Sequence, residues 1–138
     1  MIRLSWPEDT PEIERLALAQ YQRTPWPLAG KFPLAETFHV CEREGHLAAC
    51  AGYRREGSEI RVMHVWAEDG FSGKRAAVEL MCDLENMADA EGLDLVFDTM
   101  PENVGLRAAV EEHGCKSGFE TPGSVDYRRR AKVALGRA

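Results

Sequence analysis

Two adjacent cations, Lys74 and Arg75, lie in the first turn of a segment whose apolar spacing predicts a helix. Ser72 is the expected N-cap, because a serine oxygen accepts hydrogen bonds from first-turn amides. Unpaired N–H groups and the positive end of the helix dipole favour an anion at such a helix start. Glu68 and Asp69 bring negative charge close to the same place. The pattern is typical of a phosphate-binding helix start, and also of a helix cap that binds nothing.

The cysteines and histidines do not form a ligand set. No two cysteines form a C-x-x-C pair, and the histidines do not lie at metal-ligand spacing from them. We therefore predict no metal site, and we expect reduced, mostly buried thiols of a cytoplasmic protein. His64 lies in a strand-like segment, where a histidine is more often part of the core than a catalyst. The residues concerned are Cys41, Cys50, Cys82, Cys115, His39, His46, His64 and His113.

The overall composition is that of one globular domain. The 138 residues are 44% hydrophobic and 29% charged, which is enough to close a single core. No apolar run reaches the roughly 18 residues of a membrane span, and the N-terminus shows no secretory signal. We therefore expect no membrane contact. The net charge of −6 disfavours general binding to nucleic acid.

The C-terminal segment differs from the rest of the chain in charge. From Asp126 to Ala138 it holds Arg128, Arg129, Arg130, Lys132 and Arg137 against one aspartate. The pattern predicts one domain over residues 1–127 and a basic tail over 128–138. Such a tail is usually solvated, and it is alternatively a docking segment for an acidic protein or for nucleic acid.

Turn residues and apolar spacing predict an α/β (α+β) domain with a mixed, mostly antiparallel central sheet and flanking helices. Short turns between successive strands indicate an antiparallel meander, and the strand after the long helix implies a parallel crossover. Alternation places Ile60, Val62, His64 and Trp66 on one face of the third meander strand. Strands are expected at 2–4, 37–43, 46–54, 59–67, 93–97, near Phe119 and at 125–127, and helices after Asp9, Ser72 and Asn103.

This order of elements resembles the GNAT acyltransferases along nearly the whole chain. Four stretches carry the resemblance, namely IRLSWPEDTPEIERLA, a strand ending in VWAEDG, GKRAAVELMCDLENMADAEGLDLV and MPENVGLRAAVEEHGCKSGFE. In such a fold a bulged central strand separates from its parallel neighbour, so that its backbone can bond the amides of a pantetheine arm. The resemblance implies an acyl-CoA site. Its expected residues are Val65, Trp66, Ala67, Gly73, Lys74, Arg75, Ala76, Ala77 and Asn103.

Two departures from the family pattern concern the residues that handle acyl-CoA. In the phosphate loop, Ser72 stands at the usual Gln or Arg position and Arg75 at the first Gly, whereas Ala77 fits. In the last helix, Val110 stands where the family has the tyrosine that protonates the leaving thiolate. The alternatives nearby are His113, Cys115 and Tyr127.

The resemblance also suggests a catalytic base. Glu59 lies six residues before Val65, where the family often has a Glu or His base, although a solvent-facing Glu beside a turn has the same spacing. The implied function is acyl-CoA-dependent N-acyltransfer, with acetyl-CoA as donor and direct transfer to a small-molecule or protein amine. An alternative is a catalytically eroded domain with a structural or interaction role, as in some phage virions, and a third is an acyl-CoA sensor.

Overall fold

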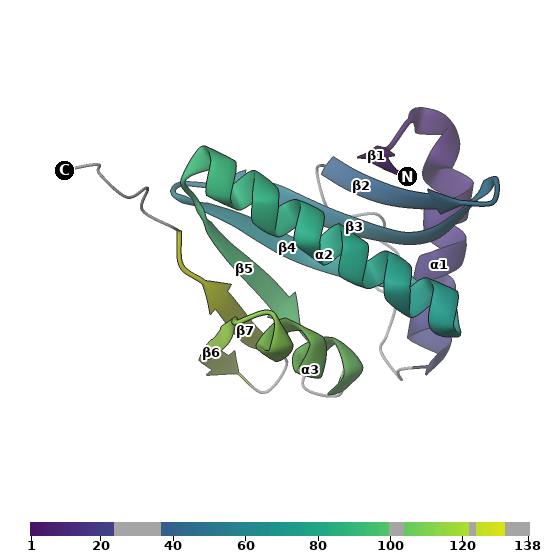
Figure 1. The fold of residues 1–138 in the computed structure, drawn as a ribbon. Coiled ribbons are helices and arrows are strands. Elements are labelled where there is room, and N and C mark those ends of the chain that lie inside the picture. The colour runs from purple at the N-terminus through teal and green to yellow at the C-terminus, as the bar shows by residue number, and fades with distance from the viewer. Residues whose placement is uncertain (24–36, 100–103, 122–123, 132–138) are drawn as a thin grey trace.

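Seven strands form one sheet in the order β1-β2-β3-β4-β5-β7-β6 in the computed structural model, which describes residues 1–23, 37–99, 104–121 and 124–131 (Figure 1). All neighbouring strands are antiparallel except β4 and β5, which are parallel. The predicted meander and the predicted mixed sheet are therefore confirmed. The strands are β1 (Ile2–Leu4), β2 (Thr37–Arg43), β3 (His46–Glu56), β4 (Glu59–Ala67), β5 (Asp94–Thr99), β6 (Lys116–Thr121) and β7 (Ser124–Arg129).

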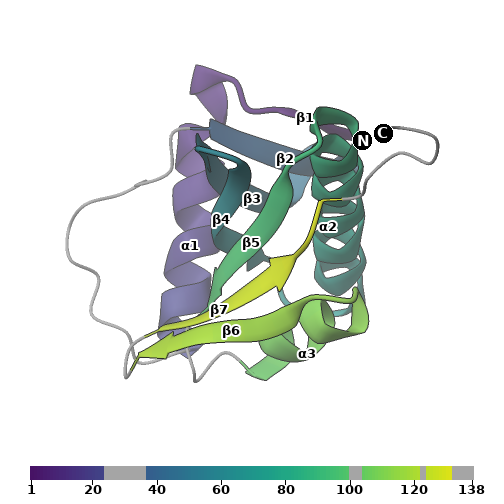
Figure 2. The same ribbon diagram turned by 90° about the vertical axis from the view of Figure 1, so that its left-hand side faces the viewer.

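Three α-helices cover the two faces of this sheet. Helix α1 (Thr10–Arg23) packs on one face, and α2 (Phe71–Glu91) and α3 (Val104–Glu112) lie on the other (Figure 2). A short 3₁₀ turn, η1 (Pro7–Asp9), precedes α1. The Asp9 carboxylate caps this turn by accepting from the Trp6 N–H at 2.7 Å, and it also pairs with Arg3 at 2.7 Å. The sequence predicts Asp9 as the cap of the first α-helix. In the structure, Asp9 caps the 3₁₀ turn that precedes this helix.

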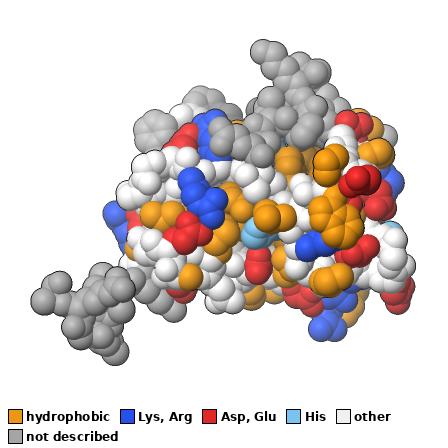
Figure 3. Space-filling view, turned by 90° about the horizontal axis from the view of Figure 1, so that it is seen from above, with side chains coloured by type: hydrophobic (Ala, Val, Ile, Leu, Met, Phe, Trp, Pro, Cys, Tyr) orange, Lys and Arg blue, Asp and Glu red, His pale blue; other side chains and the backbone are white. Residues whose placement is uncertain are grey.

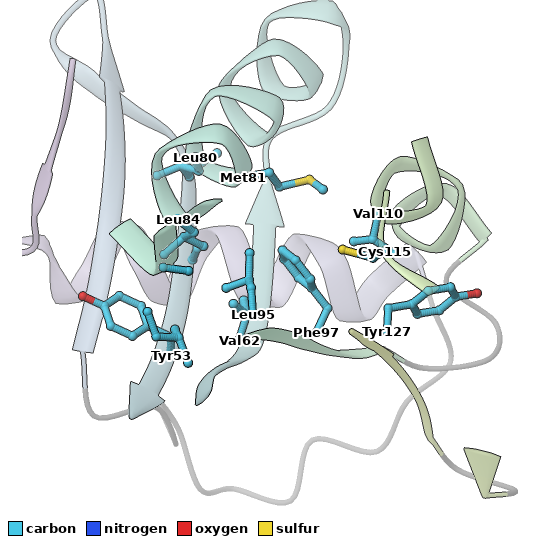
Figure 4. Packing of buried hydrophobic residues seen from close by; sticks show 14 of the residues in the cluster. Tyr53, Val62, Leu80, Met81, Leu84, Leu95, Phe97, Val110, Cys115 and Tyr127 are labelled. Carbon is cyan, nitrogen blue, oxygen red and sulfur yellow. The ribbon is translucent and has the colours of Figure 1, made fainter. Parts of the chain in front are cut away.

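The main core lies between the sheet and α2. The apolar stripe of α2 rests on β3, β4 and β5, and Met81 points toward Val110 of α3 (Figure 4). Full burial of a leucine-sized side chain stabilises a fold by about 1.5–3 kcal/mol. The long helix is thus held by its packing against the sheet. Its fully buried or nearly buried apolar residues are Ala76, Leu80, Met81, Leu84 and Ala88.

A second, smaller core lies under α1 on the opposite face of the sheet. It joins residues of α1 to residues of β2, β3 and β4. Its largest aromatic side chain is Trp66, which is 4% exposed and stacks on Phe38. The members of this core are Ile13, Leu16, Ala17, Phe38, Val40, Leu47, Cys50 and Trp66.

A β-bulge at Met63 divides β4 between these two cores. Tyr53 of β3 pairs with Val62, but the adjacent Gly52 pairs with His64, so Met63 is an extra residue. Val62 contributes to the α2 core, whereas Trp66 contributes to the α1 core. The expected alternation, with all four side chains on one face, is therefore wrong beyond Val62, because one inserted residue reverses the faces.

The β1 edge of the sheet, seen from above in Figure 3, has hydrophobic side chains among acidic and basic ones. Exposed apolar residues near this edge include Leu4 and Trp6, and Arg3 lies 3.6 Å from the centre of the Trp6 ring. Within the described ranges, no helix is long and apolar enough to cross a membrane. The same ranges hold no cluster of three or more residues able to ligate a metal ion.

The first residues of the predicted basic tail belong to the sheet. Strand β7 continues to Arg129, two residues past the predicted boundary. Arg128 pairs with Glu59 at 3.0 Å and with Asp94 at 2.7 Å, and Arg129 pairs with Asp89 at 2.8 Å. These two guanidinium groups are therefore paired with carboxylates of the domain itself.

The bulge predicts a measurable pH dependence through His64. Burial lowers the pKa of the His64 imidazole to about 4. A histidine with a lowered folded pKa binds fewer protons in the folded state, so its stabilising contribution is complete above pH 6.5 and is lost as the pH falls toward 4. We expect His64→Gln to remove about 3 kcal/mol of the decrease in unfolding free energy over this range, measured by urea denaturation.

His46 is the matched control for this experiment. Its contact with Glu68 raises the pKa of His46, so its stabilising contribution is lost as the pH rises. His46→Gln should therefore not reduce the loss of stability between pH 6.5 and 4. Equal slopes for wild type and His64→Gln would show that the His64 imidazole is not desolvated.

Candidate active site

A groove of about 500 Å³ lies between the end of β4, the first half of α2, and α3. Its volume is within the range of ordinary ligand sites. Its walls are mostly apolar, and three of its four charged residues lie where β4 leads into α2, the fourth being Glu112 at the end of α3. The lining residues are Val65, Ala67, Glu68, Asp69, Gly70, Lys74, Ala77, Val78, Met81, Gly105, Leu106, Ala108, Ala109 and Glu112.

The groove exists because β4 and β5 separate. Their parallel ladder ends with the Val62–Phe97 pair, although β4 continues to Ala67 and remains paired with β3. The bulge at Met63 follows the last pair directly, and bulges bend the strand that carries them. The β5-facing edge from Met63 to Val65 therefore lies outside the β4–β5 ladder. This is the arrangement that a peptide-like arm can use as a pseudo-strand.

Helix α2 begins earlier than the sequence predicted. Its N-cap is Gly70, with φ of 94°, whereas Ser72 lies inside the first turn. The N–H of Lys74 donates to the Gly70 carbonyl at 3.2 Å, which closes the first turn. The amides of Phe71, Ser72 and Gly73 precede this bond and are the orphan donors of the helix start. The predicted anion-binding geometry thus lies two residues nearer to β4.

The turn between β4 and α2 is held in place by close contacts at Glu68. The Glu68 N–H donates to the Ala48 carbonyl at 2.9 Å, and its carboxylate lies 3.1 Å from Nε2 of His46. A Cβ on Gly73 would lie 1.8 Å from the Glu68 carbonyl oxygen. Gly73 is therefore required because α2 packs against this turn. The glycine faces Glu68 and is buried, so it does not line the groove.

The two cations of the helix start face different surfaces. Lys74 lines the groove, whereas Arg75 lies outside it, with its guanidinium 5.7 Å from the centre of the exposed Phe71 ring. Arg75 lines a separate shallow depression with Phe71, Lys74, Val78 and Glu79. Lys74 is thus the only cationic side chain among the groove-lining residues described. Three acidic residues line the same groove, namely Glu68, Asp69 and Glu112.

The structure brings together four of the predicted cofactor residues and separates the others. Val65, Ala67, Lys74 and Ala77 line the groove. Trp66 faces the α1 core, because it alternates with Val65 and Ala67 along the strand. Ala76 is buried in the main core together with the α2 stripe. Asn103 lies outside the described residues.

Glu59 is not near the groove. It lies at the opposite end of β4, and six strand residues correspond to about 20 Å. Its carboxylate pairs with Arg61 at 2.9 Å and with Arg128 at 3.0 Å. The expected catalytic base is therefore held in an ion-pair network far from Val65. The spacing in the sequence did not reveal this, because it specifies a position along the strand and not the partners there.

The candidates for the thiolate acid also point elsewhere. Val110 is buried in the main core, so its position does not face the groove. His113 contacts Glu85 of α2, and burial raises the pKa of the Cys115 thiol to about 11. The Tyr127 hydroxyl donates to the Glu111 carboxylate at 2.8 Å and accepts from Arg107 at 3.1 Å. None of these side chains lines the groove.

One wall of the groove was missed at the sequence level. Helix α3 contributes five lining residues, and none of them is among the residues predicted to bind acyl-CoA or to act as the thiolate acid. Small residues at three of these positions were the available signal, because they allow a ligand to approach the helix closely. At Gly105 an added Cβ would have no neighbour within 4 Å. The five residues are Gly105, Leu106, Ala108, Ala109 and Glu112.

Solved structures with the same architecture were found by comparison of the folds. No protein-family model and no curated protein match the sequence. The PaiA N-acetyltransferase from Thermoplasma acidophilum, solved with coenzyme A, superposes with a TM-score of 0.75 at 10% identity, covering 94% of this chain and 99% of its own. A ribosomal-protein-alanine N-acetyltransferase from Brucella melitensis gives 0.74 at 15% identity, with 94% and 99% coverage.

An N-acetyltransferase from Staphylococcus aureus gives a TM-score of 0.70 at 14% identity, covering 93% of this chain and 98% of its own. These likenesses extend over nearly the full length of every chain compared. The fold of this protein is the GNAT fold, and the resemblance seen in the sequence is confirmed at the level of the fold.

The close contact at Gly73 predicts that alanine is not tolerated there. The Gly73→Ala variant must displace the Glu68 carbonyl, so we expect a loss of about 1–3 kcal/mol in unfolding free energy. Gly105→Ala is the matched control, because its Cβ meets open space and alanine favours a helix by up to about 1 kcal/mol. Urea denaturation distinguishes them. Equal stabilities would contradict the tight β4–α2 turn.

Proposed function

We propose that this chain is an acyl-CoA-dependent N-acyltransferase that transfers an acetyl group directly to an amine. The observation that carries the proposal is the groove at the separation of β4 and β5, which ends at the start of α2. It combines an open strand edge, an apolar passage and a helix N-terminus in the order in which an acyl-CoA presents its thioester, pantetheine and phosphates. The coenzyme A complex of a protein with the same fold supports this assignment.

The described residues fit the two halves of acyl-CoA unequally. The pantetheine arm fits an apolar passage between Val65, Met81 and Leu106. The diphosphate would lie at the first-turn amides of α2, with Lys74 as its cationic side chain. Glu68 and Asp69 lower the positive potential there, although Glu68 is partly balanced by His46. We therefore expect acyl-CoA affinity to depend strongly on Lys74.

The groove residues favour direct transfer over a covalent intermediate. No cysteine or hydroxyl side chain is present among the groove-lining residues described, so these residues offer no thiol or hydroxyl to carry the acyl group. The amine nitrogen attacks the thioester carbonyl, the C–S bond breaks, and the thiolate takes up the proton that the amine loses. We assign the stabilisation of the developing oxyanion to a backbone amide of the Met63–Val65 segment, which lies outside the β4–β5 ladder.

Lys74 and Arg75 provide a matched pair of charge variants. Lys74→Gln removes the groove cation, so we expect acetyl-CoA binding to weaken about tenfold, which corresponds to about 1.4 kcal/mol. Arg75→Gln removes the same charge from the adjacent surface and should change the affinity by less than about threefold. Isothermal titration calorimetry measures both. A stronger effect of Arg75→Gln would place the phosphates on the outer face of α2.

Occlusion of the groove tests the site independently of charge. Ala77→Leu fills the passage, whereas Ala90→Leu adds the same side chain to an exposed position of the same helix. Acetyl-CoA at about one hundred times its dissociation constant should stabilise wild type and Ala90→Leu by about 2.7 kcal/mol, and Ala77→Leu much less. Thermal unfolding measures this shift. No shift of the wild type at millimolar acetyl-CoA would favour the structural or interaction role instead.

A further inference from the structure

His46 and Glu68 form a hydrogen-bonded pair at the end of the groove proposed for the phosphates. The Nε2 atom of His46 lies 3.2 Å and 3.1 Å from the two oxygens of the Glu68 carboxylate, so it contacts both. His46 is the first residue of β3, and Glu68 lines the groove directly after the end of β4. His46 is not among the described residues that line the groove. The imidazole therefore acts on the groove through this carboxylate.

The hydrogen bond of this pair does not depend on the charge of the imidazole. An ionised carboxylate only accepts hydrogen bonds, so Nε2 of His46 carries the hydrogen of the contact. The proton that distinguishes the charged imidazole from the neutral one is then on Nδ1. Deprotonation of His46 thus removes a positive charge but leaves the contact with Glu68 in place.

The charge of Glu68 is held close to the first turn of α2. The Glu68 N–H donates to the Ala48 carbonyl at 2.9 Å. A Cβ on Gly73 would lie 1.8 Å from the Glu68 carbonyl oxygen and 3.2 Å from its Cγ, so both the backbone and the side chain of Glu68 pack against the helix start. The Glu68 side chain is 24% exposed, which means that solvent screens its charge only in part.

The formal charges at this end of the groove are unbalanced when His46 is neutral. The lining there holds one cation, Lys74, and two carboxylates, Glu68 and Asp69. A protonated His46 restores the balance, because its charge is in direct contact with Glu68. The diphosphate of acyl-CoA is strongly anionic, so a net negative charge at its site opposes its binding.

The surroundings of His46 favour its protonated form. The hydrogen bond with Glu68 is the main cause that raises the pKa of His46, and the Glu44 backbone carbonyl and the Glu12 carboxylate act in the same direction. A raised pKa means that the imidazole is charged below its ordinary pKa of about 6.5 and loses this charge as the pH rises through the folded value. His46 therefore changes charge on the alkaline side of this value.

The cations on the elements around His46 are already paired. Arg43 lies opposite His46 in the β2–β3 register, and its guanidinium contacts Glu79 of α2. Arg15 of α1 contacts Glu12 at 3.7 Å. Within the described ranges, the charged residues on the elements packed around His46 are Glu12, Arg15, Arg43, Glu44, Glu68, Asp69 and Lys74.

We propose that His46 is a positioning residue of the acyl-CoA site and makes donor binding depend on pH. The inference rests on the proposed function and describes the regulation of the same site. The protonated imidazole compensates Glu68, so that the phosphates bind at the first-turn amides of α2 beside Lys74. The neutral imidazole leaves the charge of Glu68 uncompensated, and the phosphates are repelled. By linkage, bound acyl-CoA raises the proton affinity of His46 by the same factor.

Three substitutions separate the charge of His46 from its hydrogen bond. His46→Gln keeps a donor for Glu68 but is neutral at every pH, whereas His46→Arg keeps a donor and a permanent charge. Glu68→Gln removes the charge that His46 compensates and conserves the size of the side chain. His113→Gln is the matched control, because His113 contacts Glu85 of α2 and neither is among the described groove-lining residues.

Isothermal titration calorimetry of the full chain with acetyl-CoA measures the effect at about pH 6 and about pH 8.5. At the higher pH, His46→Arg and Glu68→Gln should bind acetyl-CoA about fivefold more tightly than wild type, His113→Gln and His46→Gln. At the lower pH, only His46→Gln should bind more weakly than wild type, again by about fivefold. A purely structural role of His46 would weaken the Gln and Arg variants alike at both pH values, and that result would overturn the proposal.

A reciprocal measurement distinguishes this inference from the proposed function. In an NMR titration, saturating acetyl-CoA should raise the proton affinity of the His46 imidazole about fivefold and leave that of His113 unchanged. If acetyl-CoA binds without this change, the role of His46 is overturned and the proposed function stands. If acetyl-CoA binds at neither pH, both are overturned. If binding depends on His46 as expected but no amine is acetylated, the role of His46 stands and the transferase function is excluded.

Discussion

The insertion of one residue, Met63, into strand β4 is the constraint on which the rest of the structure depends. It ends the ladder with β5 at Val62, so the groove can form between the strands. It also reverses the faces of β4, so that Val65 lines the groove while Trp66 closes the α1 core. Without the bulge, the parallel ladder could continue and the alternation would bury the wrong side chains.

The turn from β4 to α2 converts this strand geometry into an electrostatic arrangement. Glu68 is anchored to Ala48, and Gly73 packs against its carbonyl, so the rotation of α2 is determined by contact and not by charge. That rotation directs Lys74 into the groove and Arg75 away from it. The departures from the family pattern therefore have unequal consequences. The arginine at a usual glycine position does not obstruct the groove, because its side chain lies on another face.

Much of the fold could be predicted because local patterns and tertiary packing agree. The alternation of the meander strands and the apolar stripe of α2 each give an element one hydrophobic face, and that face is buried in the core. The short turns then determine which strands are neighbours. The placement of Glu59 could not be predicted in this way. Its spacing from Val65 was suitable, but its carboxylate is held by Arg61 and Arg128, which are two and 69 residues away in the chain. The ion pair with Arg128 joins distant segments of the chain, and such a pair leaves no periodic signal in a sequence.

The sequence by itself determined the order of the elements, the mixed sheet and the presence of cations at the start of the long helix, because these follow from spacing along the chain. Only the tertiary structure decided which side chains share a surface. The bulge moved His64 to the α1 side, the packing of Gly73 separated Lys74 from Arg75, and the β5–β7 register placed Asp98 opposite Asp126. Each outcome depends on contacts between distant segments, whose geometry is specified only when the core closes.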